Sequence, residues 1–185
     1  MRKSKLFKGL IVLILIEVLF LAYIGIIGLV IYREKDMEVG TFTYMDCYNA
    51  LNILRQDINK NHCTMSKDEF REFVEDDLGV HFYIYKEREF KGKYIGKTYH
   101  VIRTIVVDNN LEDYDYFVCL AHELMHLKTY IGQEDYICFE TFKYLYESEE
   151  LHDIGVWYAI KQLNGFQGSG EYDIDYHIVN YLTNK

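Results

Sequence analysis

The chain has 185 residues, 50% of them hydrophobic, and a formal net charge of −9 at pH 7. Over residues 33–185 acidic residues outnumber basic ones and no basic stripe occurs, which argues against nucleic acid and acidic lipid headgroups as partners of this part of the chain. About 150 residues follow the first apolar segment, enough for one globular domain with its own core. Proline is absent, so Gly, Asn and Asp must form the turns.

The N-terminal region divides into a basic segment and a long apolar one. Residues 1–8 contain four basic side chains, and residues 9–32 are apolar apart from Glu17. As a helix this apolar run would extend for about 36 Å, enough to cross a bilayer with some tilt. No small-residue cleavage site occurs between Tyr23 and Lys35, which argues against a signal peptide that is removed. The sequence therefore predicts a transmembrane helix over 9–32.

The charges flanking this span favour one orientation. Four basic residues precede it, whereas Arg33 and Lys35 follow it closely. The positive-inside tendency then keeps the N-terminus in the cytoplasm and sends the rest of the chain outside. Long domains follow this bias only loosely, so the side of the membrane stays open. We expect a single-pass membrane protein.

Apolar periodicity predicts two helices at the start of the domain over residues 41–185. The first covers residues 41–60. The second begins after Ser66, which forms a capping box with Glu69, and ends at Gly79.

Strands and a third helix should follow. β-Branched and aromatic residues predict a strand at 80–85, and one or two more within 94–107 with a break near Gly96. A turn at 108–110 then leads into a helix over about 113–130. This order of helices, small sheet and helix predicts an α+β domain.

The strongest motif in the chain is His122-Glu123-Leu124-Met125-His126. On a helix, two histidines four residues apart project from the same face and can share one Zn²⁺. Glu123 lies beside them without ligating the ion, where it can act as the general base toward water. The alternative is that His122 and His126 are core residues that bind no metal, but histidines are uncommon in a helix this apolar.

A zinc hydrolase also needs a third protein ligand and an open fourth position. The residues after the motif helix supply several oxygen and nitrogen donors close together in sequence. Composition alone does not choose among these candidates, which are Glu147, Glu149, Glu150, His152 and Asp153.

The strand at 104–107, the motif and the segment 151–159 resemble the ImmA/IrrE-type metallopeptidases of phages, conjugative elements and bacterial stress regulators. In that family the motif usually reads H-E-L-G-H, and a later helix carries E-x-x-A-[ND]-x-F-A, whose first Glu is the third zinc ligand. If Tyr158-Ala159 is aligned with the F-A of this signature, Gly155 aligns with its Ala and His152 aligns with the ligand Glu. Sliding the alignment by one residue selects Asp153 instead. Val156 departs from the family by replacing the polar residue of the signature.

The resemblance implies a zincin-like metallopeptidase domain in a bacterial cell membrane, with Zn²⁺ held by His122, His126 and His152. It also implies a protein or peptide substrate, often a regulatory helix-turn-helix repressor. With Glu123 as the base, the strand over 102–107 would flank the cleft and pair with an extended substrate. The candidates for stabilising the oxyanion are His100, Tyr172, Tyr176 and His177.

Another class of function remains open. In the resembling family a proline follows the helix of the second signature, whereas this chain has Lys161-Gln162-Leu163-Asn164 there. This difference and the altered second signature are compatible with a membrane-tethered interaction protein that keeps a zinc-stabilised fold without proteolysis. Zinc content does not separate this hypothesis from a zinc metalloendopeptidase, because both bind the metal. Peptide cleavage compared between the natural chain and a Glu123→Gln variant does.

Overall fold

The computed structural model describes residues 15–19, 40–58, 60, 62–87, 96–108, 110–129, 134–164 and 173–184. The chain divides into two compact units, Met1–Glu34 and Lys35–Lys185. In the first unit only residues 15–19 are described, and they are helical. The predicted basic segment 1–8 and most of the predicted span 9–32 therefore lie outside the described residues. No helix within the described residues is long and apolar enough to cross a membrane.

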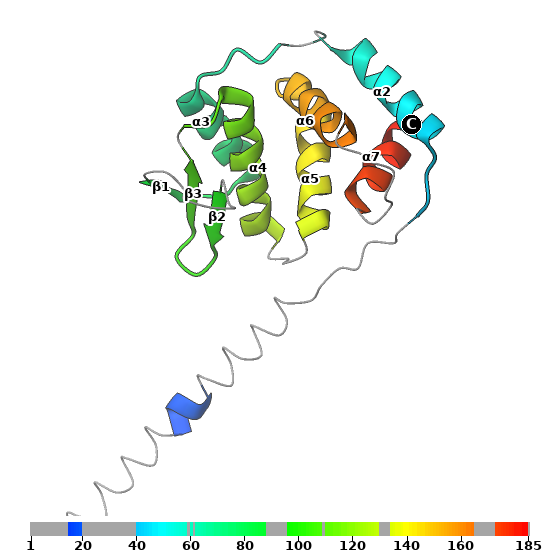
Figure 1. Ribbon diagram of the computed structural model, residues 1–185. Helices are drawn as coiled ribbons and strands as arrows, with labels where there is room; N and C mark the ends of the chain where they lie inside the picture. The colour runs from blue at the N-terminus through cyan, green and yellow to red at the C-terminus, as the bar shows by residue number, and fades with distance from the viewer. Residues whose placement is uncertain are drawn as a thin grey trace, which may run out of the picture. The chain divides into compact units, whose positions relative to one another are not determined.

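The second unit begins with two capped helices (Figure 1). Helix α2, Tyr44–Asp57, is shorter than the predicted 41–60 and starts from a capping box between Thr43 and Asp46. Helix α3, Lys67–Leu78, has the predicted box, in which the Ser66 hydroxyl accepts from the Glu69 backbone N–H. It ends at a glycine in the left-handed conformation (φ 61°), as the sequence predicts.

Three strands form a mixed sheet in the order β1-β3-β2. Strand β1, Tyr83–Glu87, runs parallel to β3, Thr104–Asp108, while β2, Gly96–Tyr99, is antiparallel to β3. The break between β2 and β3 falls at residues 100–103, not near Gly96 as predicted. Because β3 is central, its two edges are already paired. The prediction that this strand pairs with a substrate is therefore wrong, and the edge strand beside the later helices is β2.

Four helices complete the unit: α4, Asp113–Thr129; α5, Glu134–Glu147; α6, His152–Asn164; and α7, Asp173–Thr183. Helix α4 confirms the predicted motif helix. It lies between the sheet and α5, and α6 and α7 continue beyond α5 (Figure 1). The predicted α+β class is confirmed: the described residues are mostly helical with one small mixed sheet.

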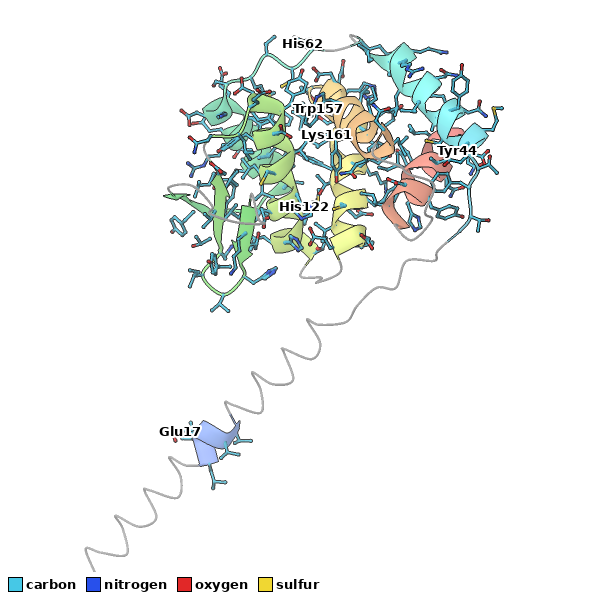
Figure 2. All side chains as sticks on the ribbon, viewed as in Figure 1. Glu17, Tyr44, His62, His122, Trp157 and Lys161 are labelled. Atoms are coloured by element: carbon cyan, nitrogen blue, oxygen red, sulfur yellow. The ribbon has the colours of Figure 1, made fainter. Side chains whose placement is uncertain are left out.

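Buried side chains of the described residues form two clusters. Figure 2 draws the side chains on the elements that contribute to them. One joins the sheet, α3 and α4, with Phe70 stacked on Phe117 at 4.2 Å. The other joins α2, α5, α6 and α7 around Phe142 and Ile178. Val118 of α4 packs against both clusters. The motif helix is thus the wall that the two clusters share, which fixes it firmly in place.

A glycine sets the distance between α5 and α6. A Cβ atom on Gly155 would lie 2.5 Å from the backbone nitrogen of Tyr146 and 2.6 Å from its Cα. Backbone atoms cannot rotate away, so α6 can approach α5 this closely only without a side chain here.

We expect Gly155→Ala to lower the free energy of unfolding by about 1–3 kcal/mol, because the added methyl group forces the two helices apart. Helix propensity alone predicts the opposite sign, a gain of about 1 kcal/mol. A denaturant titration of the full chain decides between them. A variant more stable than the natural chain would show that the close approach carries no steric constraint.

Candidate metal centre

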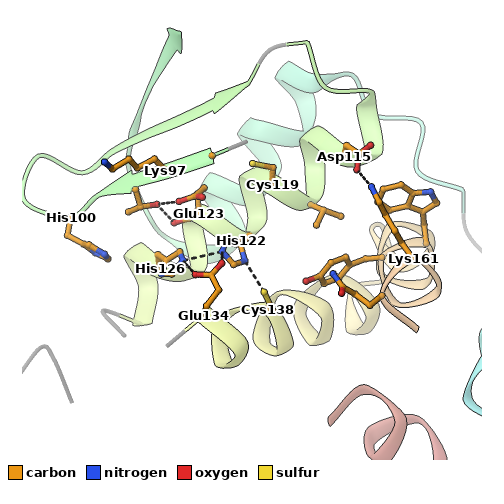
Figure 3. A pocket seen from close by; sticks show the side chains of 16 residues that line it. Lys97, His100, Asp115, Cys119, His122, Glu123, His126, Glu134, Cys138 and Lys161 are labelled. Carbon is orange, nitrogen blue, oxygen red and sulfur yellow. Dashed lines mark hydrogen bonds and ion pairs between the residues drawn. The ribbon is translucent and has the colours of Figure 1, made fainter. Parts of the chain in front are cut away.

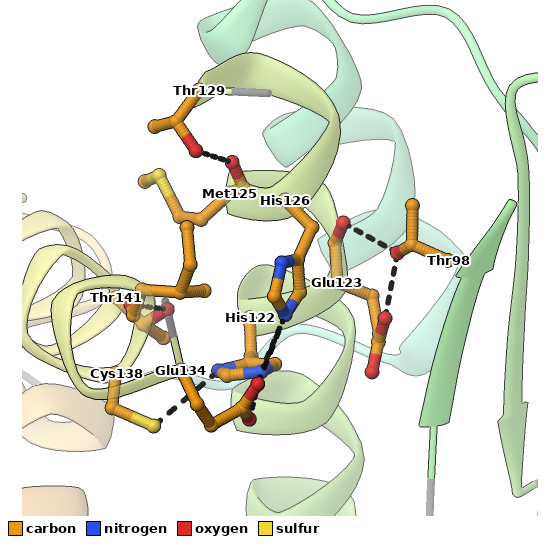
Figure 4. A network of polar contacts seen from close by, with 10 residues as sticks. Thr98, His122, Glu123, Met125, His126, Thr129, Glu134, Cys138 and Thr141 are labelled. Atoms are coloured by element: carbon orange, nitrogen blue, oxygen red, sulfur yellow. Dashed lines mark hydrogen bonds and ion pairs between the residues drawn. The ribbon is translucent and has the colours of Figure 1, made fainter. Parts of the chain in front are cut away.

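Two imidazoles on α4 form the centre of the candidate site (Figure 4). His122 and His126 are one helical turn apart, and their Nε2 atoms lie 3.1 Å from each other. Their side chains are 15% and 14% exposed, and the two rings are nearly perpendicular at 81°. Two ring nitrogens this close need a proton or a cation between them, because their lone pairs would otherwise repel.

A carboxylate from the next helix meets both rings. Glu134 is the first residue of α5, and its Oε1 atom lies 2.9 Å from His122 Nε2. Its Oε2 atom lies 3.4 Å from His126 Nε2. We call these three residues the His–His–Glu cluster. It joins two helices at a point where neither imidazole faces solvent freely.

The His–His–Glu cluster has the spacing that a small divalent cation requires. Metal–ligand bonds of about 2.0–2.1 Å place tetrahedral ligand atoms about 3.3–3.4 Å apart. The two imidazole Nε2 atoms are 3.1 Å apart, close to that value, and the two different Glu134 oxygens lie 2.9 Å from His122 and 3.4 Å from His126. Two imidazoles and one carboxylate leave a fourth position open for water or substrate.

Cys138 lies on the other side of the His122 ring. Its Sγ atom is 3.7 Å from His122 Nδ1, and His122, Glu134 and Cys138 offer donor atoms within 4.8 Å of one another. These three residues can hold a metal ion. However, Cys138 lies beside His122 Nδ1, whereas Glu134 lies beside His122 Nε2. The two nitrogens of one imidazole point in different directions and cannot bind the same ion. With the ion at Nε2, the thiol instead holds the orientation of the ring.

The charges around the cluster favour a cation. Burial alone would lower the pKa of His122, but the neighbouring Cys138 and Glu134 outweigh it and raise that pKa to about 10. Hydrogen bonds from His122 and His126 hold the pKa of Glu134 well below its usual range. These contacts therefore stabilise positive charge at His122 and keep the Glu134 carboxylate ionised.

Glu123 points toward β2 rather than into the cluster. Its side chain is buried, and the Thr98 hydroxyl lies 2.6 Å from its Oε2 and 2.8 Å from its carbonyl oxygen. Burial raises the pKa of Glu123, against the lowering effects of Thr98 and the two histidines. Such a shift brings a carboxyl closer to the pKa that suits proton transfer near neutral pH.

Gly96 makes the approach of β2 possible. A Cβ atom there would lie 2.6 Å from Cys119 Sγ and 2.7 Å from Glu123 Oε1. The missing side chain lets the strand lie directly against the motif helix, where Thr98 reaches Glu123.

One cavity of about 630 Å³ contains all these groups (Figure 3). Its walls come from β2, α4, α5 and α6, and its size falls in the usual range for ligand pockets, about 300–1,000 Å³. The residues that line it are Gly96, Lys97, Thr98, His100, Asp115, Val118, Cys119, His122, Glu123, His126, Glu134, Cys138, Trp157, Tyr158, Lys161 and Gln162.

The structure does not bring His152 to the imidazole pair. Its Nδ1 lies 2.5 Å from the carbonyl oxygen of Tyr146, and it does not line the cavity. Asp153, the alternative third ligand, is also engaged elsewhere: its Oδ2 accepts from the Cys63 backbone N–H at 3.0 Å and from the Tyr114 hydroxyl. His152 and Asp153 are the first residues of α6, whereas Glu134, whose carboxylate lies beside the imidazoles, is the first residue of α5.

Of the residues considered for the oxyanion, His100 lines the cavity. Its ring centroid is 6.4 Å from that of His126. Burial and the charge of His126 lower the pKa of His100, which favours a neutral ring that can still donate one N–H. Tyr176 and His177 belong to α7 and do not line the cavity, and Tyr172 lies outside the described residues.

Sequence reasoning missed Glu134 and Cys138. A signal was present, because the two are four residues apart and so share one face of a helix. The E-x-x-A-[ND] signature spaces its ligand and its polar residue in the same way. Aligning Tyr158-Ala159 with the end of that signature selects residues at the start of α6 instead.

Comparisons with protein-family models, with curated proteins and with solved structures found no match. The resemblance to ImmA/IrrE-type metallopeptidases therefore stays a prediction from the sequence.

We expect Glu134→Gln to weaken zinc binding at least about 100-fold, because it removes an anionic donor facing both imidazoles. Competition with a zinc chelator measures the change. His152→Gln is the matched control and should leave the affinity within about twofold. Weaker binding in the His152 variant, with Glu134→Gln unaffected, would restore the ligand set that the sequence resemblance implies.

Proposed function

We propose that the chain is a zinc-dependent metallopeptidase that hydrolyses peptide bonds in a protein substrate, with a zincin-like catalytic domain. The observation that carries this proposal is the His–His–Glu cluster in the same cavity as the buried Glu123. Nitrogen-rich sites of this kind suit zinc better than magnesium or calcium, which prefer all-oxygen ligands. The cavity of about 630 Å³ leaves room for part of a substrate beside the cluster.

In this proposal His122, His126 and Glu134 hold the Zn²⁺. When bound, zinc polarises the substrate carbonyl and lowers the pKa of water toward neutrality. Glu123 accepts the proton of the attacking water and then delivers it to the leaving amine. Thr98 holds the Glu123 carboxyl in position, and an N–H of His100 is placed to stabilise the oxygen of the tetrahedral intermediate.

Strand β2 offers a place for the substrate backbone. It is one of the two edge strands of the described sheet, and it lies against the motif helix on the side of Glu123. An extended peptide can add to such an edge through main-chain hydrogen bonds. Its scissile carbonyl would then pass between β2 and the imidazoles.

We expect Glu123→Gln to lower kcat for peptide cleavage by about 10²–10⁴-fold, because the amide cannot accept the proton of water. Zinc stoichiometry should stay the same, since Glu123 lies outside the His–His–Glu cluster. Cleavage of a quenched fluorogenic peptide library measures kcat, and elemental analysis of the same preparations measures the zinc stoichiometry.

Glu112→Gln is the matched control for this experiment, because Glu112 is exposed and does not line the cavity. It should cleave like the natural chain. Equal cleavage by the Glu123 variant would overturn the mechanism. A natural chain that binds zinc but cleaves nothing in the library would favour the non-proteolytic, zinc-stabilised interaction protein.

We further propose that residues 9–32 anchor the domain in a bacterial cell membrane as a single span. The basic residues before this segment favour a domain outside the cell. A protease added to intact cells should then degrade the domain without permeabilisation. Protection until the membrane is opened would place it in the cytoplasm, where a regulatory protein such as a repressor is within reach.

A further inference from the structure

We propose that one half of the cavity is a specificity pocket for a bulky uncharged side chain of the substrate, aromatic by preference. This half lies between the His–His–Glu cluster and an ion pair formed by Asp115 and Lys161 (Figure 3). The inference rests on the proposed peptidase function and names the class of substrate.

The position of this half-cavity fits the residue next to the scissile bond. Val118 and Cys119 precede His122 by about one turn of α4, and Asp115 precedes it by about two. These offsets correspond to about 5–6 Å and 10 Å along the helix. Residues of an extended peptide are about 3.3 Å apart, so a side chain flanking the cleaved bond reaches this space.

Apart from Gln162, the walls of the pocket are apolar or aromatic. Val118 and Cys119 form the α4 side, and burial raises the pKa of the Cys119 thiol, which keeps it neutral. Trp157 and Tyr158 of α6 form the opposite side. The Tyr114 ring meets the Trp157 indole edge-on at 5.9 Å and holds it in place. Aromatic walls favour an aromatic guest through stacked or edge-on contacts.

The far end of the pocket has opposite charges that cancel. Lys161 Nζ lies 2.5 Å from Asp115 Oδ1 and 4.6 Å from the centroid of the Trp157 ring. A charged guest would have to compete with one member of this pair for the other. An uncharged guest leaves the ion pair and the cation–π contact intact. The pair thus selects against acidic and basic side chains alike.

The test uses two substitutions that break the same ion pair in opposite ways. Asp115→Asn leaves the positive charge of Lys161, so cleavage should shift toward peptides with Asp or Glu at this position. Lys161→Gln leaves the negative charge of Asp115, so cleavage should shift toward Lys or Arg. We expect shifts of about fivefold in relative kcat/KM, because both groups are partly exposed.

The readout is a positional library of internally quenched peptides cleaved by the zinc-loaded full chain. Loss of packing alone would move both variants in the same direction, so opposite shifts support the pocket. A third variant, Trp157→Leu, should lower the preference for Phe and Trp over Ala about tenfold.

Two negative results are distinguishable. If the natural chain cleaves no peptide, the proposed function fails. If it cleaves without preference for a bulky uncharged side chain, or both charge variants shift alike, the pocket is refuted while the peptidase proposal stands.

Discussion

The junction between the last turns of α4 and the first turn of α5 is the constraint on which the site depends. The C-terminal end of a helix has a partial negative charge, which favours a cation near His126, and the N-terminal end of the next helix favours a carboxylate such as Glu134. The two helix ends therefore complement the groups that they bring together. A divalent ion bound between them would neutralise the carboxylate and offset the repulsion between two ring nitrogens 3.1 Å apart.

Two glycines determine how closely β2 and α6 approach the helices of this junction. Gly96 lets β2 lie against α4, and Gly155 lets α6 lie against α5. The first contact brings the Thr98 hydroxyl to Glu123, and the second fixes the helix that presents Trp157 and its neighbours to the cavity. A Cβ atom at Gly155 would meet backbone atoms, and one at Gly96 would meet the Cys119 and Glu123 side chains, so both faces of the cavity depend on these glycines.

The sequence predicts this site only as far as local patterns reach. The H-E-x-x-H spacing and its apolar context identify the motif helix, and the Ser66–Glu69 box identifies the start of α3, because each signal lies within a single turn. The third donor depends on how α5 packs against α4, which no local pattern specifies. The sheet order is equally non-local. Strand β3 comes last in the sequence but lies between β1 and β2 in the sheet, so periodicity could not identify the central strand.

Two carboxylates in one cavity receive opposite roles from their surroundings. Glu134 is 67% exposed at a helix N-terminus and faces two imidazoles, and these contacts lower its pKa, so it stays ionised as a ligand must. Glu123 is 7% exposed between α4 and β2, and burial raises its pKa, so it can exchange a proton. In the proposed mechanism only the buried Glu123 carboxyl exchanges a proton, which its raised pKa favours. A purely structural metal site needs the first carboxylate and has no use for the second. The cost of burying Glu123 is therefore the physical argument that favours a peptidase over a zinc-stabilised interaction module.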